Sequence, residues 1–402
     1  MIQIAILGFG TVGSGVAQVL QRNTEKITSG AAEAISLKYI LELRDLPKDN
    51  PFAAKIVRDF SIIEKDPEVQ VVVECIGGVE AAYAYTKRCL NAGKSVVTSN
   101  KELVAEKGYE LLALAREKNL NYLFEASVGG GIPILRPISQ CLAGNEIDEI
   151  YGILNGTTNY ILTRMRQANL SFEAALKEAQ EKGFAEADPR ADIEGDDACR
   201  KICILGSLGF GHHIYPQQVP TEGISKVKPQ DMAYAKSANR KIKLFGRAVR
   251  QKGEKVAAYV APHLISRDSV LANVEEEFNG IVVKGNAIGS VMFCGAGAGK
   301  LPTASAVVAD VIDCAKHVHA RKYVDWYADD PQFEGDPLDL PSRWYVRVPA
   351  GAKTDSFGQV EHLDYPGSDP GERAFFTAPM SQREIEPKGR AAQAYSAFRV
   401  FD

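Results

Sequence analysis

The chain has 402 residues, of which 45% are hydrophobic and 24% are charged, and its formal net charge at pH 7 is -4. This length predicts two or three domains, and this composition excludes a disordered chain and gives no reason to expect nucleic acid as a partner. An apolar run of about 18 residues and an amino-terminal signal are both absent, so we expect no membrane partner and a mature chain that starts at Met1.

The first part of the chain alternates short β-branched runs with longer helical patterns. The expected strands are residues 2–7, 37–43, 69–76 and 95–98, and the expected helices are residues 12–22, 80–91 and 102–118. This alternation is typical of βαβ units around a parallel sheet. We therefore predict a Rossmann-type nucleotide-binding domain over residues 1–130.

The first expected strand ends in a glycine-rich turn. Its residues are Gly8, Phe9, Gly10, Thr11, Val12 and Gly13. Glycines at this spacing permit a tight turn, close approach of the backbone to a pyrophosphate, and close packing of helix on strand. Because the turn follows a strand and opens a helix, we favour a dinucleotide-binding site over a chance glycine turn.

Charged residues follow the second expected strand, where dinucleotide enzymes recognise the ribose. An acid, either Glu42 or Asp45, would suit the ribose hydroxyls of NAD, whereas Arg44, with Lys48 close behind, would suit the 2'-phosphate of NADP. We favour NADP and keep NAD open. The alternative is that these are ordinary solvated loop charges.

Thr98, Ser99 and Lys101 lie at the carboxyl end of the strand expected at 95–98. Ligands of open α/β sheets bind outside those ends, so these residues are site candidates. Lys101 would meet either the cofactor or a substrate carboxylate. The alternative is a surface lysine at the start of a helix.

A second glycine-rich turn runs from Glu125 to Pro133 and contains three consecutive glycines. Such a turn sends main-chain carbonyls in unusual directions, and carbonyl oxygens clustered with a carboxylate suit a hard cation. A flexible hinge between domains explains the same residues equally well.

Residues 131–320 mix helical patterns with strand-like runs and predict an α+β catalytic and dimerisation domain. The helical patterns are residues 172–182 and 196–208, and the strand-like runs are residues 150–154, 256–260 and 280–284. A further helix at 303–319 follows a glycine turn, and we expect it to pack back on the first domain. Beyond it, residues 321–402 contain strand-like runs at 344–348 and 374–377, which indicate a small appended module or arm.

An acidic segment precedes the apolar helix expected at 196–208. Its six carboxylates are Glu186, Asp188, Asp192, Glu194, Asp196 and Asp197. Free amides at a helix start account for one or two of them. Asp197 and Lys201 are four residues apart, so they form either a simple stabilising ion pair or a site in which a partly buried lysine is a general acid. In the second interpretation, Glu186 and Asp192 would bind an ammonium group.

Six segments between residue 1 and about residue 320 carry the most distinctive motifs of the chain. In chain order they are GFGTVG, TSNKELVA, EASVGGGIPIL, LAGNEIDEIYGILNGTTNYIL, GFAEADPRADIEGDDACRK and GAGAGKLPTASAV. In these segments the chain resembles the homoserine dehydrogenase family, and NGTTNYIL and ADPxxDxxGxDAxxK are particular to it. The resemblance implies reversible NAD(P)H-dependent reduction of L-aspartate 4-semialdehyde to L-homoserine, on the route to threonine, isoleucine and methionine.

The resemblance also implies roles for individual residues. Lys201 would donate the proton, Glu186 and Asp197 would hold the amino-acid end of the substrate, and Asp192 and Lys101 would be supporting polar residues. Gly299 would approach the cofactor. A sodium ion would be bound by Glu125 and by main-chain oxygens of Val128, Gly130 and Ile132.

Many members of the family end in a regulatory module of the ACT type. Residues 344–348 and 374–381 resemble its first and third strands, but the polar stretch 350–372 between them contains no clear amphipathic helix. We therefore expect an ACT-like or degenerate ACT module and leave inhibition by threonine open. Seven cysteines without CxxC spacing indicate a reducing cytoplasm, and a mixed sheet in the second domain suits a homodimer or homotetramer.

Two other functions fit parts of the sequence. A phosphorylating semialdehyde dehydrogenase would form a thioester on a cysteine such as Cys141, but its sequence neighbours include no activating histidine. A non-catalytic redox sensor would need the nucleotide-binding domain, but it would not need Lys201 among carboxylates.

Overall fold

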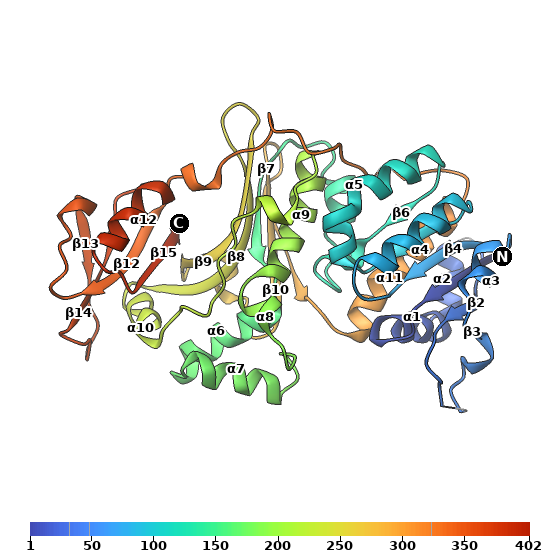
Figure 1. The fold of residues 1–402 in the computed structure, drawn as a ribbon, viewed down its shortest axis with the longest axis horizontal. Coiled ribbons are helices and arrows are strands. Elements are labelled where there is room, and N and C mark those ends of the chain that lie inside the picture. The colour runs from blue at the N-terminus through green and yellow to red at the C-terminus, as the bar shows by residue number, and fades with distance from the viewer. Residues whose placement is uncertain (32, 48, 323) are drawn as a thin grey trace. The chain divides into compact units, whose positions relative to one another are not determined.

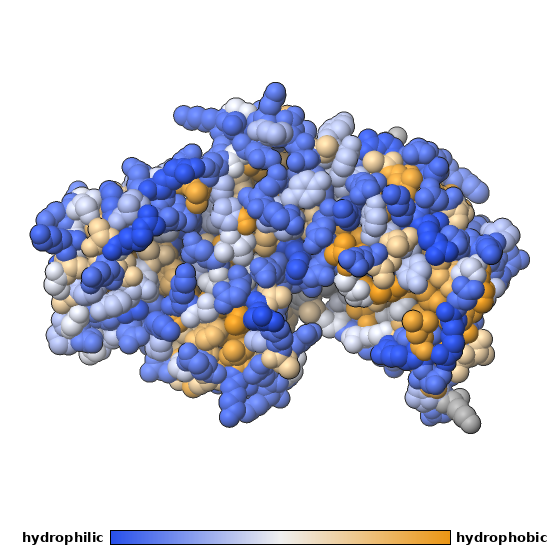
Figure 2. Space-filling model, in the orientation of Figure 1, coloured by the Kyte–Doolittle hydropathy of each residue, from blue (hydrophilic) through white to orange (hydrophobic). Residues whose placement is uncertain are grey.

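The structure is a computed structural model that describes residues 1–31, 33–47, 49–322 and 324–402 (Figure 1). The chain forms two compact units, and several segments contribute to each. The first unit contains residues 1–145, 204–216 and 295–330, and the second contains residues 146–203, 217–294 and 331–402. Figure 2 shows a face that is mostly hydrophilic, with smaller hydrophobic patches. None of the helices within the described ranges is long and apolar enough to cross a membrane.

The first unit is built on a parallel six-stranded sheet with the order β3-β2-β1-β4-β5-β6. Its strands are β1 (Ile2–Leu7), β2 (Ile35–Leu41), β3 (Ile56–Val57), β4 (Val69–Glu74), β5 (Ser95–Thr98) and β6 (Tyr122–Leu123). Its helices are α1 (Thr11–Arg22), α2 (Thr24–Ala31), α3 (Phe60–Lys65), α4 (Glu80–Asn91), α5 (Lys101–Glu117) and α11 (Lys300–Lys316). This strand order is that of the Rossmann fold and confirms the predicted α/β class.

The core of the first unit joins segments from both ends of its sequence. Ile4 and Ile6 of β1, Val16 of α1 and Val307 of α11 are all fully buried in one hydrophobic cluster. Helices α1 and α11 approach closely at Gly15, where a Cβ atom would lie 2.8 Å from the main-chain oxygen of Lys300. A residue larger than glycine would therefore push the start of α11 away from α1.

The second unit is built on a nine-stranded mixed sheet with the order β11-β10-β7-β8-β9-β15-β12-β14-β13. Its strands are β7 (Ile147–Ile153), β8 (Arg240–Arg250), β9 (Val256–Ser266), β10 (Phe278–Gly285), β11 (Gly289–Ala296), β12 (Arg343–Pro349), β13 (Val360–Leu363), β14 (Glu372–Thr377) and β15 (Ser396–Phe401). Its helices are α6 (Gly156–Ala168), α7 (Phe172–Glu181), α8 (Arg190–Ile193), α10 (Pro229–Ser237), α12 (Gln382–Ala391) and α9 (Asp196–Phe210), which begins in this unit. Helices α6 and α10 pack against β8.

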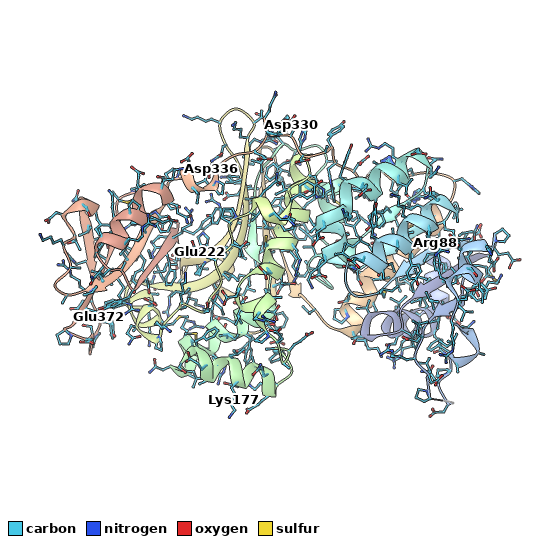
Figure 3. The ribbon with its side chains drawn as sticks, in the orientation of Figure 1. Arg88, Lys177, Glu222, Asp330, Asp336 and Glu372 are labelled. Carbon is cyan, nitrogen blue, oxygen red and sulfur yellow. The ribbon has the colours of Figure 1, made fainter. Side chains whose placement is uncertain are left out.

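The C-terminal strands continue this sheet, because β15 pairs in parallel with β9. Buried Asp231 of α10 also holds strand β12 in place, because it accepts hydrogen bonds from Tyr345 Oη (2.9 Å) and Arg347 Nε (2.8 Å). Arg347 also donates to Glu372 at the start of β14, labelled in Figure 3. Where the sequence suggests a separate module from residue 321, residues 331–402 group with the second unit and residues 321–330 with the first. The ACT-type identity of this segment stays a prediction.

Candidate active site

Lys201 and Asp197 form a buried ion pair in the first two turns of α9. The exposed fractions of the two residues are 8% and 5%. The Lys201 Nζ atom donates to Asp197 Oδ2 (2.7 Å) and to the main-chain oxygen of Leu154 (2.8 Å), which follows the last residue of strand β7. An ammonium group has three donors, and within the described part of the chain these two acceptors occupy two of them. The third N–H is available to a ligand.

Asn155 connects this pair to a second carboxylate. As the N-cap of α6, it accepts a hydrogen bond from the Thr158 amide through Oδ1 (2.8 Å). Its Nδ2 donates to Asp192 Oδ1 (2.7 Å) and to Asp197 Oδ2 (2.8 Å). Sequence reasoning missed Asn155, although an asparagine between a strand and a helical pattern is a recognisable cap signal.

The cluster carries two carboxylates and one lysine, which leaves an excess of negative charge. Burial, and then the charge of Asp197, raise the pKa of Asp192 above its ordinary value. A cation placed beside Asp192 would relieve both effects, since it would compensate the buried charge. The cluster therefore suits a ligand with an ammonium group.

The other carboxylates of the acidic segment lie outside the cluster. Glu186 is exposed in the loop after α7, and its carboxylate accepts no hydrogen bond from any residue that the structure describes. Asp188 pairs with Arg190. Of the predicted substrate residues in this unit, the structure brings together Lys201, Asp197 and Asp192.

The glycine turn after β1 has the shape of a phosphate cradle. Gly8 adopts a positive φ of 89°, and a Cβ atom at Gly13 would lie 2.1 Å from the main-chain oxygen of Gly8. A Cβ atom at Gly10 would meet nothing within 4 Å. Gly10 caps α1 without a side chain, and the first turn of α1 contains no acidic residue. The helix amides and the open surface at Gly10 therefore fit the pyrophosphate of a dinucleotide.

Arg44 and Glu42, which follow β2, form a bidentate ion pair. Arg44 donates to Glu42 through Nε (3.1 Å to Oε1) and through Nη2 (2.7 Å to Oε2), and these bonds lower the pKa of Glu42 to about 2. Glu42 Oε2 also accepts from the Phe9 amide (3.2 Å), which links the pair to the glycine turn. The Arg44 side chain is 70% exposed. Lys48, the second cation predicted near the 2'-phosphate, lies outside the described residues.

A buried carboxyl group organises the loop after β5. Thr98 Oγ1 donates to Glu74 Oε2 (2.5 Å) and accepts from the Asn100 amide (2.9 Å). Burial raises the pKa of Glu74 to about 7. Asn100 caps α5, which begins at half-buried Lys101. Ser99 lies between them, so the predicted residues share one hydrogen-bonded loop.

In the second glycine turn, the carboxylate of Glu125, predicted as a sodium ligand, is a hydrogen-bond acceptor for the main chain that follows. It accepts hydrogen bonds from the amides of Ile134 (2.6 Å), Leu135 (2.9 Å) and Arg136 (2.7 Å), and so caps the helical turn that follows. In the described ranges, no three His, Cys, Asp or Glu residues are grouped to hold a metal ion. A cation here would therefore need main-chain oxygens in addition to the Glu125 carboxylate.

The main-chain oxygens of Val128, Gly130 and Ile132 fit that requirement. None of them accepts a hydrogen bond from a described backbone or side-chain donor. The backbone at Gly129 and Gly130 has positive φ angles of 71° and 54°. The turn thus offers oxygens of the kind that a hard cation prefers.

A Rossmann-type unit with an open phosphate cradle, and a unit with a buried lysine among carboxylates, together define a dehydrogenase that uses a nicotinamide nucleotide. Residues 8–125 match the family model for the homoserine dehydrogenase NAD binding domain, and residues 133–312 match that for homoserine dehydrogenase. The homoserine dehydrogenase of Bacillus subtilis is 39% identical over 366 residues, which are 89% of this chain and 84% of the relative.

Solved structures agree with these matches. A homoserine dehydrogenase from Thiobacillus denitrificans has a TM-score of 0.91 and 34% identity, covering 100% of this chain and 98% of the other. A hyperthermophilic archaeal homoserine dehydrogenase in complex with NADPH has a TM-score of 0.66 and 27% identity, covering 78% and 97%. The chain belongs to the homoserine dehydrogenase family of oxidoreductases. This membership favours neither the thioester-forming enzyme nor the redox sensor.

Proposed function

We propose that Lys201 is the proton donor of this homoserine dehydrogenase, acting on the aldehyde oxygen of L-aspartate 4-semialdehyde. NADPH, when bound, supplies the hydride that forms the new C–H bond. As the carbonyl double bond is reduced, negative charge builds on its oxygen, and the third N–H of Lys201 stabilises that charge and delivers the proton that completes the hydroxyl group of L-homoserine. The observation that carries this role is the buried ammonium group, held by Asp197 and the Leu154 carbonyl.

The carboxylates around Lys201 hold the substrate's ammonium group. Asp192 and Asp197 share Asn155 as donor, and the raised pKa of Asp192 indicates an uncompensated charge. Glu186 is proposed from the family resemblance as a further substrate ligand, and its exposed carboxylate would bind the substrate's ammonium group together with the cluster. Lys101 is proposed to meet the substrate's carboxylate or the cofactor.

The cofactor is NADP, with NAD as the alternative. The glycine turn from Gly8 to Gly13 receives the pyrophosphate, and Thr98, Ser99 and Gly299 approach the rest of the nucleotide. Arg44 recognises the 2'-phosphate, since its exposed guanidinium neutralises Glu42 and keeps donors that no described residue occupies. The NADPH complex of the archaeal relative supports this choice.

A sodium ion binds at the second glycine turn, through Glu125 and main-chain oxygens of Val128, Gly130 and Ile132. The hydrogen bonds that the Glu125 carboxylate accepts from the amides of Ile134 and Arg136 also hold the turn in shape. The enzyme acts in the cytoplasm, as a homodimer or homotetramer, in the biosynthesis of threonine, isoleucine and methionine. Family membership supports this setting, and the seven free thiols fit a reducing compartment.

The test is homoserine oxidation with NAD and with NADP, measured for the wild type and for Lys201→Ala. We expect kcat to fall by about 10²- to 10⁴-fold in the variant, the usual range for a lost general acid, with cofactor binding retained. Lys94→Met is the matched control, because Lys94 is also buried but donates to the main-chain oxygens of Asp66 and Val69. Full activity of Lys201→Ala would refute the assigned role.

A further inference from the structure

The main-chain oxygen of Leu154 is a meeting point for three elements of the second unit. It accepts a hydrogen bond from Lys201 Nζ of α9 (2.8 Å) and another from Asn279 Nδ2 of β10 (2.9 Å). Strand register explains why Asn279 is there: Gly280 pairs with Ile153 in antiparallel β10 and β7, which places the residue before Gly280 opposite the residue after Ile153. The carbonyl that orients Lys201 is thus held from the neighbouring strand.

The surroundings leave Asn279 little freedom to move. Its side chain is fully buried. A Cβ atom at Gly152 would lie 2.2 Å from the main-chain oxygen of Gly280, and one at Gly156 would lie 2.5 Å from that of Glu277. The backbones on both sides of Leu154 therefore lie closer to the β10 segment than any residue with a side chain would allow. The Asn279 amide is fixed against the end of β7.

The side-chain amide of Asn279 is only half satisfied by hydrogen bonds. Its Oδ1 atom is buried and has no hydrogen-bond partner within the described part of the chain. A buried polar atom without a partner destabilises the folded state, so its presence here calls for an explanation. The explanation lies in the donor end of the amide. Asn279 Nδ2 donates to the Leu154 carbonyl without placing a charge beside Lys201. A carboxylate there would attract the ammonium group, and a second cation would repel it.

We propose that Asn279 is a positioning residue that fixes the Leu154 carbonyl and thereby the direction of the Lys201 ammonium group. This inference rests on the proposed role of Lys201. Without the amide donor, the carbonyl at the end of β7 loses one of the two hydrogen bonds that it accepts from described residues, and the other comes from the lysine that it orients. The Lys201 N–H that faces the substrate then loses its fixed direction, which lowers the rate of proton delivery more than the affinity for cofactor or substrate.

The principal test is Asn279→Leu, which has a similar volume and removes both the donor and the unpartnered oxygen. We expect kcat to fall by about tenfold or more, as for other residues that orient a reactive group. The KM for NADP and the melting temperature should stay close to those of the wild type, because the loss of one hydrogen bond is offset by the loss of the buried unpaired atom. Asn279→Asp, which keeps the shape but lacks a neutral donor, should lower kcat at least as much.

Asn121→Leu is the matched control. Asn121 is buried and donates to the main-chain oxygens of His317 and Ala320 in the first unit, so its loss should lower the melting temperature without a selective effect on kcat. The inference is overturned if Asn279→Leu keeps kcat within twofold of the wild type, or if its activity falls only in parallel with its stability. Lys201→Ala, measured alongside, separates the two proposals. An active Lys201→Ala refutes the proton donor itself, whereas an inactive Lys201→Ala with a fully active Asn279→Leu refutes only the positioning role.

Discussion

Lys201 and Asp197 are joined by a 2.7 Å hydrogen bond across one turn of α9, with both side chains almost completely buried. An exposed pair at the same spacing would contribute only a few tenths of a kcal/mol. A buried pair differs, because removing one partner leaves an uncompensated charge in a poorly solvated place. The pair therefore sets both the stability of this region and the orientation of the lysine.

Replacing the carboxylate of this pair should impair both properties. We expect Asp197→Asn to lower stability by about 3 kcal/mol and to lower kcat/KM for homoserine by about 10- to 100-fold, since Lys201 loses its counter-charge and the substrate ammonium loses a ligand. Urea unfolding and steady-state kinetics measure the two effects. Asp196→Asn is the control, because Asp196 is the exposed neighbour in the same helical turn. Equal kinetics for the two variants would contradict the role of Asp197.

Asn155 combines a helix cap with a bridge between carboxylates, and two variants separate these roles. Asn155→Asp keeps a capping oxygen for the Thr158 amide but places a third carboxylate beside Asp192 and Asp197, so activity should fall with little loss of α6. Ser171→Ala removes the cap of α7 instead and should cost about 1 kcal/mol of stability with unchanged kcat. Thermal denaturation with activity assays tests both. Wild-type activity of Asn155→Asp would show that the bridge is dispensable.

Glu74 should make stability depend on pH in the neutral range. Its pKa in the folded chain is about 7, against an ordinary value of 4.5, because it is buried. The folded state therefore binds the proton more tightly, and this contribution to stability is complete below pH 4.5 and is lost as pH rises through 7. The full loss is about 3 kcal/mol.

The isosteric Glu74→Gln has no carboxyl group to ionise. Relative to the wild type, it should gain up to about 3 kcal/mol between about pH 5 and about pH 8, measured by urea unfolding at both values. Glu110→Gln, an exposed substitution in the same unit, should show no such change. An identical difference between wild type and Glu74→Gln at both pH values would contradict the prediction.

Arg44 should determine the use of NADP. Arg44→Ala removes the guanidinium and leaves the Glu42 carboxylate uncompensated next to the 2'-phosphate, so we expect the KM for NADP to rise by about tenfold or more. The KM for NAD should change little or fall. Parallel assays with both cofactors give the ratio of the two KM values. Arg22→Ala serves as control, because Arg22 ends α1 and so lies at the end of the helix away from the glycine turn. A proportional change for both cofactors would argue against recognition of the 2'-phosphate.

The second glycine turn should bind sodium and tolerate no side chain at Gly130. A Cβ atom there would lie 2.5 Å from the main-chain oxygen of Gly297, and φ is positive. We expect Gly130→Ala to lower stability by about 2 kcal/mol or more and to abolish stabilisation by sodium. Gly144→Ala, where a Cβ atom meets nothing within 4 Å, should be neutral.

Melting temperatures in sodium chloride and in choline chloride of equal ionic strength provide the measurement. The wild type and Gly144→Ala should melt higher in sodium chloride, because an ion that binds only the folded state stabilises it. A wild type that melts at the same temperature in both salts would refute the sodium site.

The sequence alone was sufficient for features that depend on local geometry. Apolar alternation and the glycines from Gly8 to Gly13 predict β1 and the start of α1, since strand and helix periods are fixed by backbone geometry. The same reasoning places Asp197 and Lys201 on one face of α9, because residues four apart on a helix are neighbours. It left open whether that pair is an exposed ion pair on the helix surface or a buried group.

The tertiary structure decided what surrounds these features. The Leu154 carbonyl meets both Lys201 and Asn279 only because β7, β10 and α9 pack together. Residues so distant in sequence meet through strand register and packing, which no local pattern encodes. Sequence thus determined the nucleotide-binding unit and the lysine–carboxylate pair, whereas long-range packing decided how deeply that pair is buried and which groups orient it.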